Sequence, residues 1–491
     1  MDIKEYYHNS IIKDRLQNFF SGCDWFLTAG SQYSRDPCWG DDPPVRVYDI
    51  SEFDERLGDG PDVFRPIISR HGVLGVFDLE YYNTRNKELL FLPLRREMSD
   101  IPEKFGFHDL VFREYLEPVY QRISSALGDE TIADMTWSGY HFLTEIKRES
   151  PVYNKLLMLG WHLRDKNAEG PLMPNNQEMA IKMAINIRCL EPQLIAAYSA
   201  IDEADIKRRV PTTIADGVVY TMFGRILEYL CHCVISDTQK EIDVPITICD
   251  SADQGISLDI SQYGDPVYMR IIRSAFSSWD KHNMNGFVSD LVGEAPFLDV
   301  VRKYGKFENN NLPELFELAR DYESSIEYAK NFSGKIPAAG TRIFNLALQY
   351  ENSLLRRFHK DFDDVEHDPD NSTYMLAEFD ERFDARARQL MAAPNPELMQ
   401  PKNLKWFSEH LLLHGINSKH IGGIIAARYE AEDKGWKQKY WSKYLTRTRA
   451  NFWARVYCGL DNCRINDCFS AKNNSISEKD DFKLFVSSNI C

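Results

Sequence analysis

The sequence lacks the marks of secreted, membrane-spanning and disulfide-stabilised proteins. Its first residues, Met1 to Glu5, do not have the basic and then apolar character of a signal peptide, and no apolar run approaches the roughly 20 residues of a membrane span. The ten cysteines are spread from Cys23 to Cys491 and do not form the dense pattern of a small disulfide scaffold. We therefore expect reduced thiols and a cytoplasmic or nucleoid-associated protein that makes no membrane contact.

Two familiar catalytic motifs are also missing. No Gly-x4-Gly-Lys-Ser/Thr loop occurs, so the chain carries no evident ATP-driven helicase of its own. Ser138 and His141 lie outside any nucleophile elbow, and they are too close on one short segment to act as the nucleophile and base of a serine hydrolase. A phosphate-binding role suits this serine and histidine better.

What the chain does have is the composition of an ordinary globular protein. With 491 residues, of which 43% are hydrophobic and 27% charged, it has room for two or three cores. The net charge of −16 argues against a general polyanion binder, but residues 434–457 hold seven basic and no acidic side chains, interleaved with seven aromatic ones. A basic helical stripe with stacking aromatics predicts nucleic-acid binding, although the aromatics could equally form the core of a small domain. The candidate residues are Lys439, Tyr440, Lys443, Tyr444, Arg447 and Arg449.

Three short stretches carry the strongest chemical signal. In the run Val76-Phe77-Asp78-Leu79-Glu80, strand alternation puts the two carboxylates on one face, as a metal-ligand pair requires. The second stretch, residues 138–141, offers the hydroxyl of Ser138 and the imidazole of His141 beside a glycine. The third supplies another carboxylate and then three cations: Asp259, Arg270, Arg273 and Lys281.

These residue types belong together in phosphoryl transfer. Joining a nucleoside triphosphate to a 3'-hydroxyl uses divalent metals, and carboxylate oxygens are the ligands that Mg²⁺ and Mn²⁺ prefer. Arginines can meet the triphosphate in bidentate fashion, while a lysine and a histidine act as point donors. The order of acid pair, serine and histidine, third acid and basic cluster therefore predicts a two-metal nucleotidyl transferase.

Over roughly residues 60–300 these motifs resemble the archaeo-eukaryotic primase superfamily, especially its primase-polymerase branch. The matching stretches are residues 77–80, residues 138–141, and Leu258-Asp259 followed by Met269-Arg270-Ile271-Ile272-Arg273. Two features depart from the pattern. Glu80 stands where many relatives have aspartate, which makes a preference for manganese conceivable, and Arg270 lies eleven positions beyond Asp259.

Because of that spacing, the third acid could instead be Asp250, Asp253 or Asp265. Asp259 is favoured because apolar Ile256, Leu258 and Ile260 alternate with polar residues, as on a half-buried strand.

The resemblance implies an α+β protein whose acids lie on a central sheet like that of an RNA-recognition motif, flanked by a second lobe. Residues 1–300 would form the catalytic domain, residues 301–395 a helical linker region, and residues 396–491 a helical C-terminal domain. The implied activity is template-dependent DNA primer synthesis and extension, with Asp78, Glu80 and Asp259 as metal ligands. Single-stranded DNA template, primer, nucleoside triphosphates, Mg²⁺ or Mn²⁺ and a separate helicase or replication factor would be its partners.

Two alternatives remain open: a non-catalytic DNA-binding replication factor on a primase fold, and a metal-dependent nuclease. A structural zinc site is a further possibility, because four cysteines lie near the end of the chain: Cys458, Cys463, Cys468 and Cys491.

Hydrophobic periodicity predicts the main elements. Strands are expected over residues 73–79, 89–94, 140–146, 245–248 and 256–260. Helices are expected over residues 177–199, 218–235, 312–332, 342–358, 374–391, 404–413 and 419–431, and the last pair, with Ser418 as N-cap, predicts a helix-turn-helix.

Overall fold

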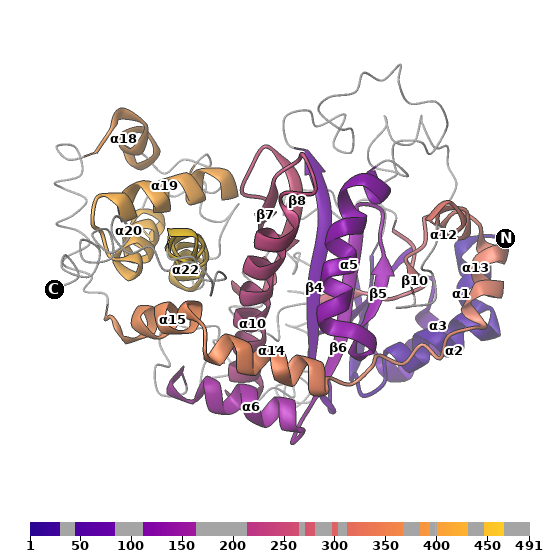
Figure 1. Cartoon of the computed structure of the whole chain (residues 1–491). Coiled ribbons are helices and arrows are strands. Elements are labelled where there is room, and N and C mark those ends of the chain that lie inside the picture. Colours follow the sequence, from indigo (N-terminus) through magenta and orange to yellow (C-terminus); the bar gives the residue numbers. More distant parts are fainter. Residues whose placement is uncertain are drawn as a thin grey trace, which may run out of the picture.

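The structure is a computed structural model. It describes residues 1–29, 45–83, 111–163, 214–264, 271–279, 297–302, 312–366, 383–392, 398, 400–430 and 446–465. Within these ranges the predicted α+β class is confirmed, with two sheets and helices around them (Figure 1). The expected elements at residues 89–94 and 177–199 lie outside the described residues.

The larger sheet has six strands in the order β10-β5-β6-β4-β8-β7. All neighbouring strands are antiparallel except β7 and β8, which run parallel. The bounds are β4 (Gly72–Asn83), β5 (Ile132–Met135), β6 (Gly139–Lys147), β7 (Ile246–Ile248), β8 (Gln254–Asp259) and β10 (Val300–Arg302). Four of the five predicted strands belong to this sheet.

β4 is the central and longest strand of this sheet because its first half is apolar on both faces. All residues from Gly72 to Phe77 are buried, and partly exposed side chains begin at Asp78. A strand buried on both faces needs cover on each side, and helix α10 (Ile214–Thr238) supplies it on one face. Gly75 permits this packing, since a Cβ there would lie 2.5 Å from the ring of Phe223 on α10.

The helix α10 contradicts the expectation that no apolar stretch approaches the length of a membrane span. Residues 215–238 are long and apolar enough to cross a membrane by length and composition, and 89% of the most apolar window is buried inside the protein. The helix packs against β4, α5 (Glu117–Leu127), α6 (Pro151–Leu159) and α14 (Thr341–Glu351). Its apolar surface is therefore used by the core.

The smaller sheet has four antiparallel strands in the order β2-β1-β3-β9. Their bounds are β1 (Trp25–Ala29), β2 (Val45–Asp49), β3 (Asp62–Pro66) and β9 (Ile271–Arg273). β9 brings a segment from far along the chain beside the N-terminal strands. Beside this sheet α3 (Phe53–Arg56), which follows η1 (Ile50–Glu52), contacts β2, while α2 (Ser10–Phe19) contacts α1 (Ile3–His8) and α13 (Tyr322–Ala329). α12 (Leu312–Ala319) contacts α13 and also β10 of the larger sheet.

The C-terminal helices gather on the side of the molecule away from α1 and α2 (Figure 1). They are α15 (Leu354–Asp364), α18 (Ala385–Ala392), α19 (Pro401–Leu413), α20 (Ser418–Glu430) and α22 (Thr446–Ile465). α22 packs against α15, α19 and α20. Short helical turns complete the description: η3 (Val111–Leu116), η4 (Gly128–Glu130), η5 (Trp161–Leu163) and η6 (Ser261–Gly264).

Local capping explains where three helical predictions differ from the structure. The helix expected over residues 312–332 is divided because Asp321 caps a new helix, its carboxylate accepting from the Ser324 amide at 2.7 Å. Ser353 divides residues 342–358 in the same way. In the α19–α20 pair, the predicted N-cap Ser418 is the first helical residue instead. Asn417 is the cap, since its side chain accepts from the Lys419 amide at 2.8 Å.

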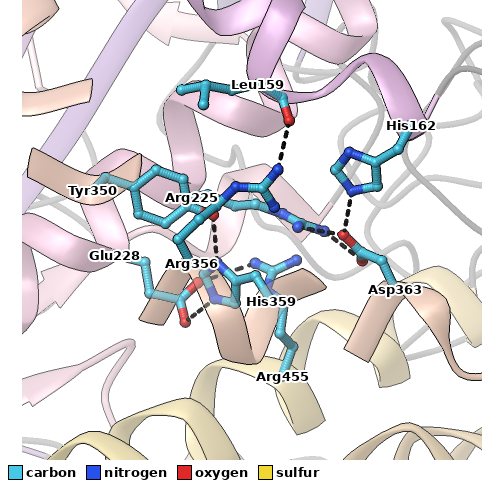
Figure 2. A network of polar contacts seen from close by, with 9 residues as sticks. All are labelled: Leu159, His162, Arg225, Glu228, Tyr350, Arg356, His359, Asp363 and Arg455. Carbon is cyan, nitrogen blue, oxygen red and sulfur yellow. Dashed lines mark hydrogen bonds and ion pairs between the residues drawn. The ribbon is translucent and has the colours of Figure 1, made fainter. Parts of the chain in front are cut away.

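A buried polar network joins the C-terminal helices to α10 (Figure 2). Arg225 of α10 makes a bidentate pair with Asp363 of α15, at 2.6 and 2.8 Å, and His162 contacts the same carboxylate at 2.9 Å. One turn along α10, Glu228 lies 3.0 Å from His359 of α15 and 3.2 Å from Arg455 of α22. Both buried acids are therefore paired with cations or imidazoles.

Candidate active site

The two predicted acids Asp78 and Asp259 and the predicted histidine lie in one row across the larger sheet. On β4, Asp78 is directly opposite His141 of β6 and directly opposite Asp259 of β8. Directly opposed residues in antiparallel strands share a face, with Cβ atoms about 4.5–5.5 Å apart. Residues far apart in the sequence are thus brought together by strand pairing.

Glu80 lies on the same face of β4 as Asp78, two residues further along. It is paired with Gly139 of β6, where glycine is required: a Cβ there would lie 1.8 Å from the carbonyl oxygen of Leu79. This close approach brings the preceding residue Ser138 to β4, and its hydroxyl lies 3.4 Å from a carboxylate oxygen of Glu80. The glycine in the predicted serine-histidine motif therefore serves strand packing.

His141 is the imidazole member of the row. Its Nε2 atom lies 3.6 Å from Oδ2 of Asp78, which is itself 27% exposed. Burial acts to lower the pKa of His141, but the charge and hydrogen-bonding of Asp78 outweigh it, and the net pKa is raised above the ordinary value. The pair places an imidazole N–H donor beside the partly exposed carboxylate.

Asp259 lies at the end of β8, where its carboxylate accepts from the backbone amide of Ser261 at 2.7 Å. This hydrogen bond holds the side chain in the turn that follows the strand. The alternatives Asp250 and Asp253 lie in the turn before β8, and Asp253 pairs with Lys402 at 2.6 Å. Asp265 lies outside the described residues. Among the described candidates, Asp259 alone stands opposite Asp78.

Arg273 reaches the site from the smaller sheet. It ends β9, and its guanidinium lies 3.3 Å from Asp299 and 3.7 Å from Asp62. The rings of Phe64 and Trp279 lie 5.5 Å from the same guanidinium. Asp299 in turn interacts electrostatically with both His141 and Asp78, so Arg273 belongs to the same charged region.

The chain that follows Arg273 is held by two tyrosines of the N-terminal helix α1. The hydroxyl of Tyr6 donates to the carbonyl of Phe276 at 3.1 Å, and the amide of Ser278 donates to the hydroxyl of Tyr7 at 2.9 Å. Phe276 has φ of 62°, an uncommon left-handed conformation for an aromatic residue. The surrounding contacts fix this conformation next to the arginine.

Sequence reasoning missed two acids of this region. Asp134 of β5 is directly opposite His141, and it is fully buried. Burial, together with Asp299, raises the pKa of Asp134 to about 8, and burial raises the pKa of Asp299 to about 6 against the opposing effect of Arg273. One signal was available for Asp134, a charged residue inside the mainly apolar run 132–137 just before the serine-histidine motif.

The donors suit a hard divalent cation, but no group of three or more His, Cys, Asp and Glu side chains within the described ranges has the geometry of a metal site. Asp78 and Asp259 face each other with partly exposed carboxylates, while Glu80 is turned to Ser138. The residue types fit Mg²⁺ or Mn²⁺ by their oxygen chemistry. Recruiting Glu80 requires its side chain to leave Ser138.

Several predicted residues lie outside the described part of the chain, wholly or in their side chains: Arg270, Lys281, Lys439, Tyr440, Lys443, Tyr444, Arg447, Cys463, Cys468 and Cys491. Arg449 is half-buried on α22. On the same helix Phe452 and Tyr457 are buried, so these two aromatics serve as core residues.

Cys458 of the predicted zinc site is a buried cysteine on α22. The zinc site that also includes Cys463, Cys468 and Cys491 stays a prediction, because those three side chains lie outside the described residues.

Comparisons of the chain with protein-family models, with curated proteins and with solved structures find no match. Its function must therefore be inferred from its own residues and their geometry.

Proposed function

We propose that the protein is a template-dependent DNA primase-polymerase that transfers nucleotides from nucleoside triphosphates to a 3'-hydroxyl. The observation that carries this proposal is the row His141–Asp78–Asp259 across β6, β4 and β8, with Glu80 on the same face. Three carboxylates, one imidazole and the nearby guanidinium of Arg273 are the groups that metal-dependent nucleotidyl transfer uses.

The roles of the side chains follow from their positions. Asp78, Glu80 and Asp259 would hold Mg²⁺ or Mn²⁺, which when bound supplies charge neutralisation and lowers the pKa of the attacking hydroxyl. His141 donates from Nε2 to a phosphate oxygen on the side where it now contacts Asp78. Ser138, freed when Glu80 turns to the metal, offers its hydroxyl to the same phosphates.

Arg273 supplies a fixed positive charge, because Asp299, Asp62 and two aromatic rings hold its guanidinium in place. Arg270 and Lys281 are proposed to assist it at the triphosphate. Basic and aromatic residues of the C-terminal region are proposed to hold the single-stranded template, and a separate helicase or replication factor to unwind it.

One experiment separates this proposal from its rivals. Full-length protein is incubated with single-stranded template, labelled nucleotides and Mg²⁺ or Mn²⁺, with and without an annealed primer. A primase-polymerase extends the primer and also makes products without it. A nuclease shortens the template, and a non-catalytic replication factor binds the template without changing it, so either result would overturn the proposal.

The matched control for this experiment is Asp259→Asn. It keeps the size of the side chain and an oxygen that can accept from the Ser261 amide, but removes the charge. Loss of synthesis in this variant with unchanged template binding is expected. Unchanged synthesis would remove Asp259 from the proposed site.

A further inference from the structure

A buried carboxyl lies beside the histidine of the candidate active site. Asp134 of β5 is directly opposite His141 in the β5–β6 register, and Asp78 is directly opposite His141 on its other side. All three side chains therefore share one face of the sheet. The imidazole stands between a partly exposed carboxylate and a fully buried carboxyl.

The buried side of this row is unsatisfied. Neither carboxyl oxygen of Asp134 has a hydrogen-bond partner in the described part of the chain, and the buried Nδ1 atom of His141 has none there either. A buried polar group left unpaired costs on the order of 1–3 kcal/mol, so its retention calls for a reason other than stability. A carboxyl and an imidazole nitrogen are complementary groups, and here they project from opposed positions of neighbouring strands.

We propose that Asp134 is a positioning residue that engages Nδ1 of His141 and thereby keeps a proton on Nε2, the nitrogen that faces Asp78 and the substrate. The assignment of the substrate as a nucleoside triphosphate rests on the function proposed above. The effect on the imidazole itself does not depend on it.

One proton shared between the Asp134 carboxyl and Nδ1 of His141 is enough for this role, whichever of the two groups carries it. If Asp134 carries it, the carboxyl O–H donates to Nδ1, and the neutral imidazole has its proton on Nε2. If the proton has moved to His141, Nδ1–H donates to the Asp134 carboxylate, and Nε2 again carries a proton. In both arrangements Nε2 is a donor, as binding a phosphate oxygen requires. The burial-raised pKa of Asp134, about 8, keeps that proton within the pair at neutral pH.

Asp134→Leu and Asp134→Asn test the proposal in opposite directions. Leucine is close in size and removes two unsatisfied oxygens, so a purely structural role for Asp134 predicts an equal or higher melting temperature with normal activity. Positioning predicts a stable protein whose nucleotide KM rises about tenfold, the effect of losing one well-placed hydrogen bond. Asparagine keeps an N–H donor for Nδ1, and its KM is expected within about threefold of wild type.

Two controls make the comparison specific. Thr28→Val also replaces a buried hydroxyl that lacks a partner among the described residues, but on β1 away from the row, and it should leave the nucleotide KM unchanged. In a His141→Gln background, Asp134→Leu should add no further rise in the nucleotide KM. If the double variant instead shows the product of the two single increases in KM, the proposal is overturned. Asp134→Val is the second apolar variant if Asp134→Leu does not fold.

A second readout does not depend on nucleotide turnover. The tautomer of His141 is measured by ¹⁵N nuclear magnetic resonance of the full chain, its signal assigned by its loss in His141→Gln. Wild type and Asp134→Asn should show Nε2–H, while Asp134→Leu should show a mixture with Nδ1–H. An unchanged tautomer in Asp134→Leu overturns the proposal. If wild type fails to incorporate nucleotides, the proposed function fails, and the tautomer comparison still decides the role of Asp134.

Discussion

Replacing Asp78 and Glu80 together by alanine is the perturbation that bears most directly on the proposed metal site. The two carboxylates share a face of β4, and Asp78 stands opposite the like-charged Asp259. If they hold the metals, their loss removes several kcal/mol of transition-state stabilisation. At about 1.4 kcal/mol per tenfold change in rate, we expect synthesis to fall at least about a thousandfold.

The same change should leave the fold intact. Two unit charges about 5 Å apart repel by roughly 3 kcal/mol at an effective dielectric constant of about 20, and partial exposure of the carboxylates reduces this further. Against this relief stands the lost contact between Asp78 and His141, whose atoms lie 3.6 Å apart. Because the two effects oppose each other, we expect the metal-free double variant to melt at the wild-type temperature or slightly above it.

The assay compares primer extension and melting temperature, with and without Mn²⁺, in wild type and the double variant. Wild type should gain stability from Mn²⁺ by mass action, and the double variant should lose that gain. The charge-matched control is Asp54→Ala with Glu55→Ala, which removes an exposed acid pair from α3.

Either of two results would refute the reasoning. A folded double variant that still extends primers would end the proposed role of the acids. Equal stabilisation by Mn²⁺ in wild type and the double variant would place the metal elsewhere.

Three further predictions concern buried charges. Arg273→Lys keeps the positive charge but loses the guanidinium that can donate two parallel hydrogen bonds to a phosphate. In steady-state kinetics the nucleotide KM should therefore rise about tenfold with template affinity unchanged. A fall in template affinity alone would contradict the assigned role. Asp363→Ala should lower the free energy of unfolding in urea by about 3–5 kcal/mol, because it strands the buried Arg225, and Arg225→Met in the same chain should recover most of the loss. Stability should also fall as pH is lowered from about 6.5 to 4. Burial lowers the pKa of His359 to about 4, so over that window the unfolded chain binds a proton that the folded chain does not. The resulting loss in the free energy of unfolding is about 3 kcal/mol, measured by urea unfolding at each pH. His359→Gln should remove this pH dependence. Glu228, with its pKa lowered to about 2 despite burial, because His359 and Arg455 favour its charge, adds to the loss only below about pH 4.

The apolar and polar pattern within a single segment was enough to predict many of the described strands and helices. β4, β6 and β8 were expected within a few residues of their actual bounds, because each contains a short, mainly apolar run, and in β8 apolar and polar residues alternate. The C-terminal helix pair was expected for the same kind of reason. Predictions differed from the structure where one side chain decides a boundary, as with Asp321 and Asn417.

The alignment across the sheet could not be read from the sequence. Asp78 and His141 are opposed through a register that nine residue pairs of β4 and β6 define together, and a shift of one residue would turn the histidine to the other face. Asp134 and Asp299 were missed because their importance arises only from burial beside residues that are distant in the chain. Apolar neighbours on both sides of these aspartates indicate burial, but they do not show which residues lie beside them in the fold.

α10 links the two regions to which the proposed function assigns different tasks. One side of this helix packs on β4, where Phe223 fits against Gly75, and another side carries Glu228, whose carboxylate pairs with Arg455 of α22. Both contacts are buried, so neither can shift without exposing apolar surface or stranding a charge. If α22 and its neighbours hold the template, as proposed, α10 fixes their distance from the acids of β4. A template strand would then be held at a fixed distance from these acids, and no closure of α22 toward β4 would be needed to start synthesis.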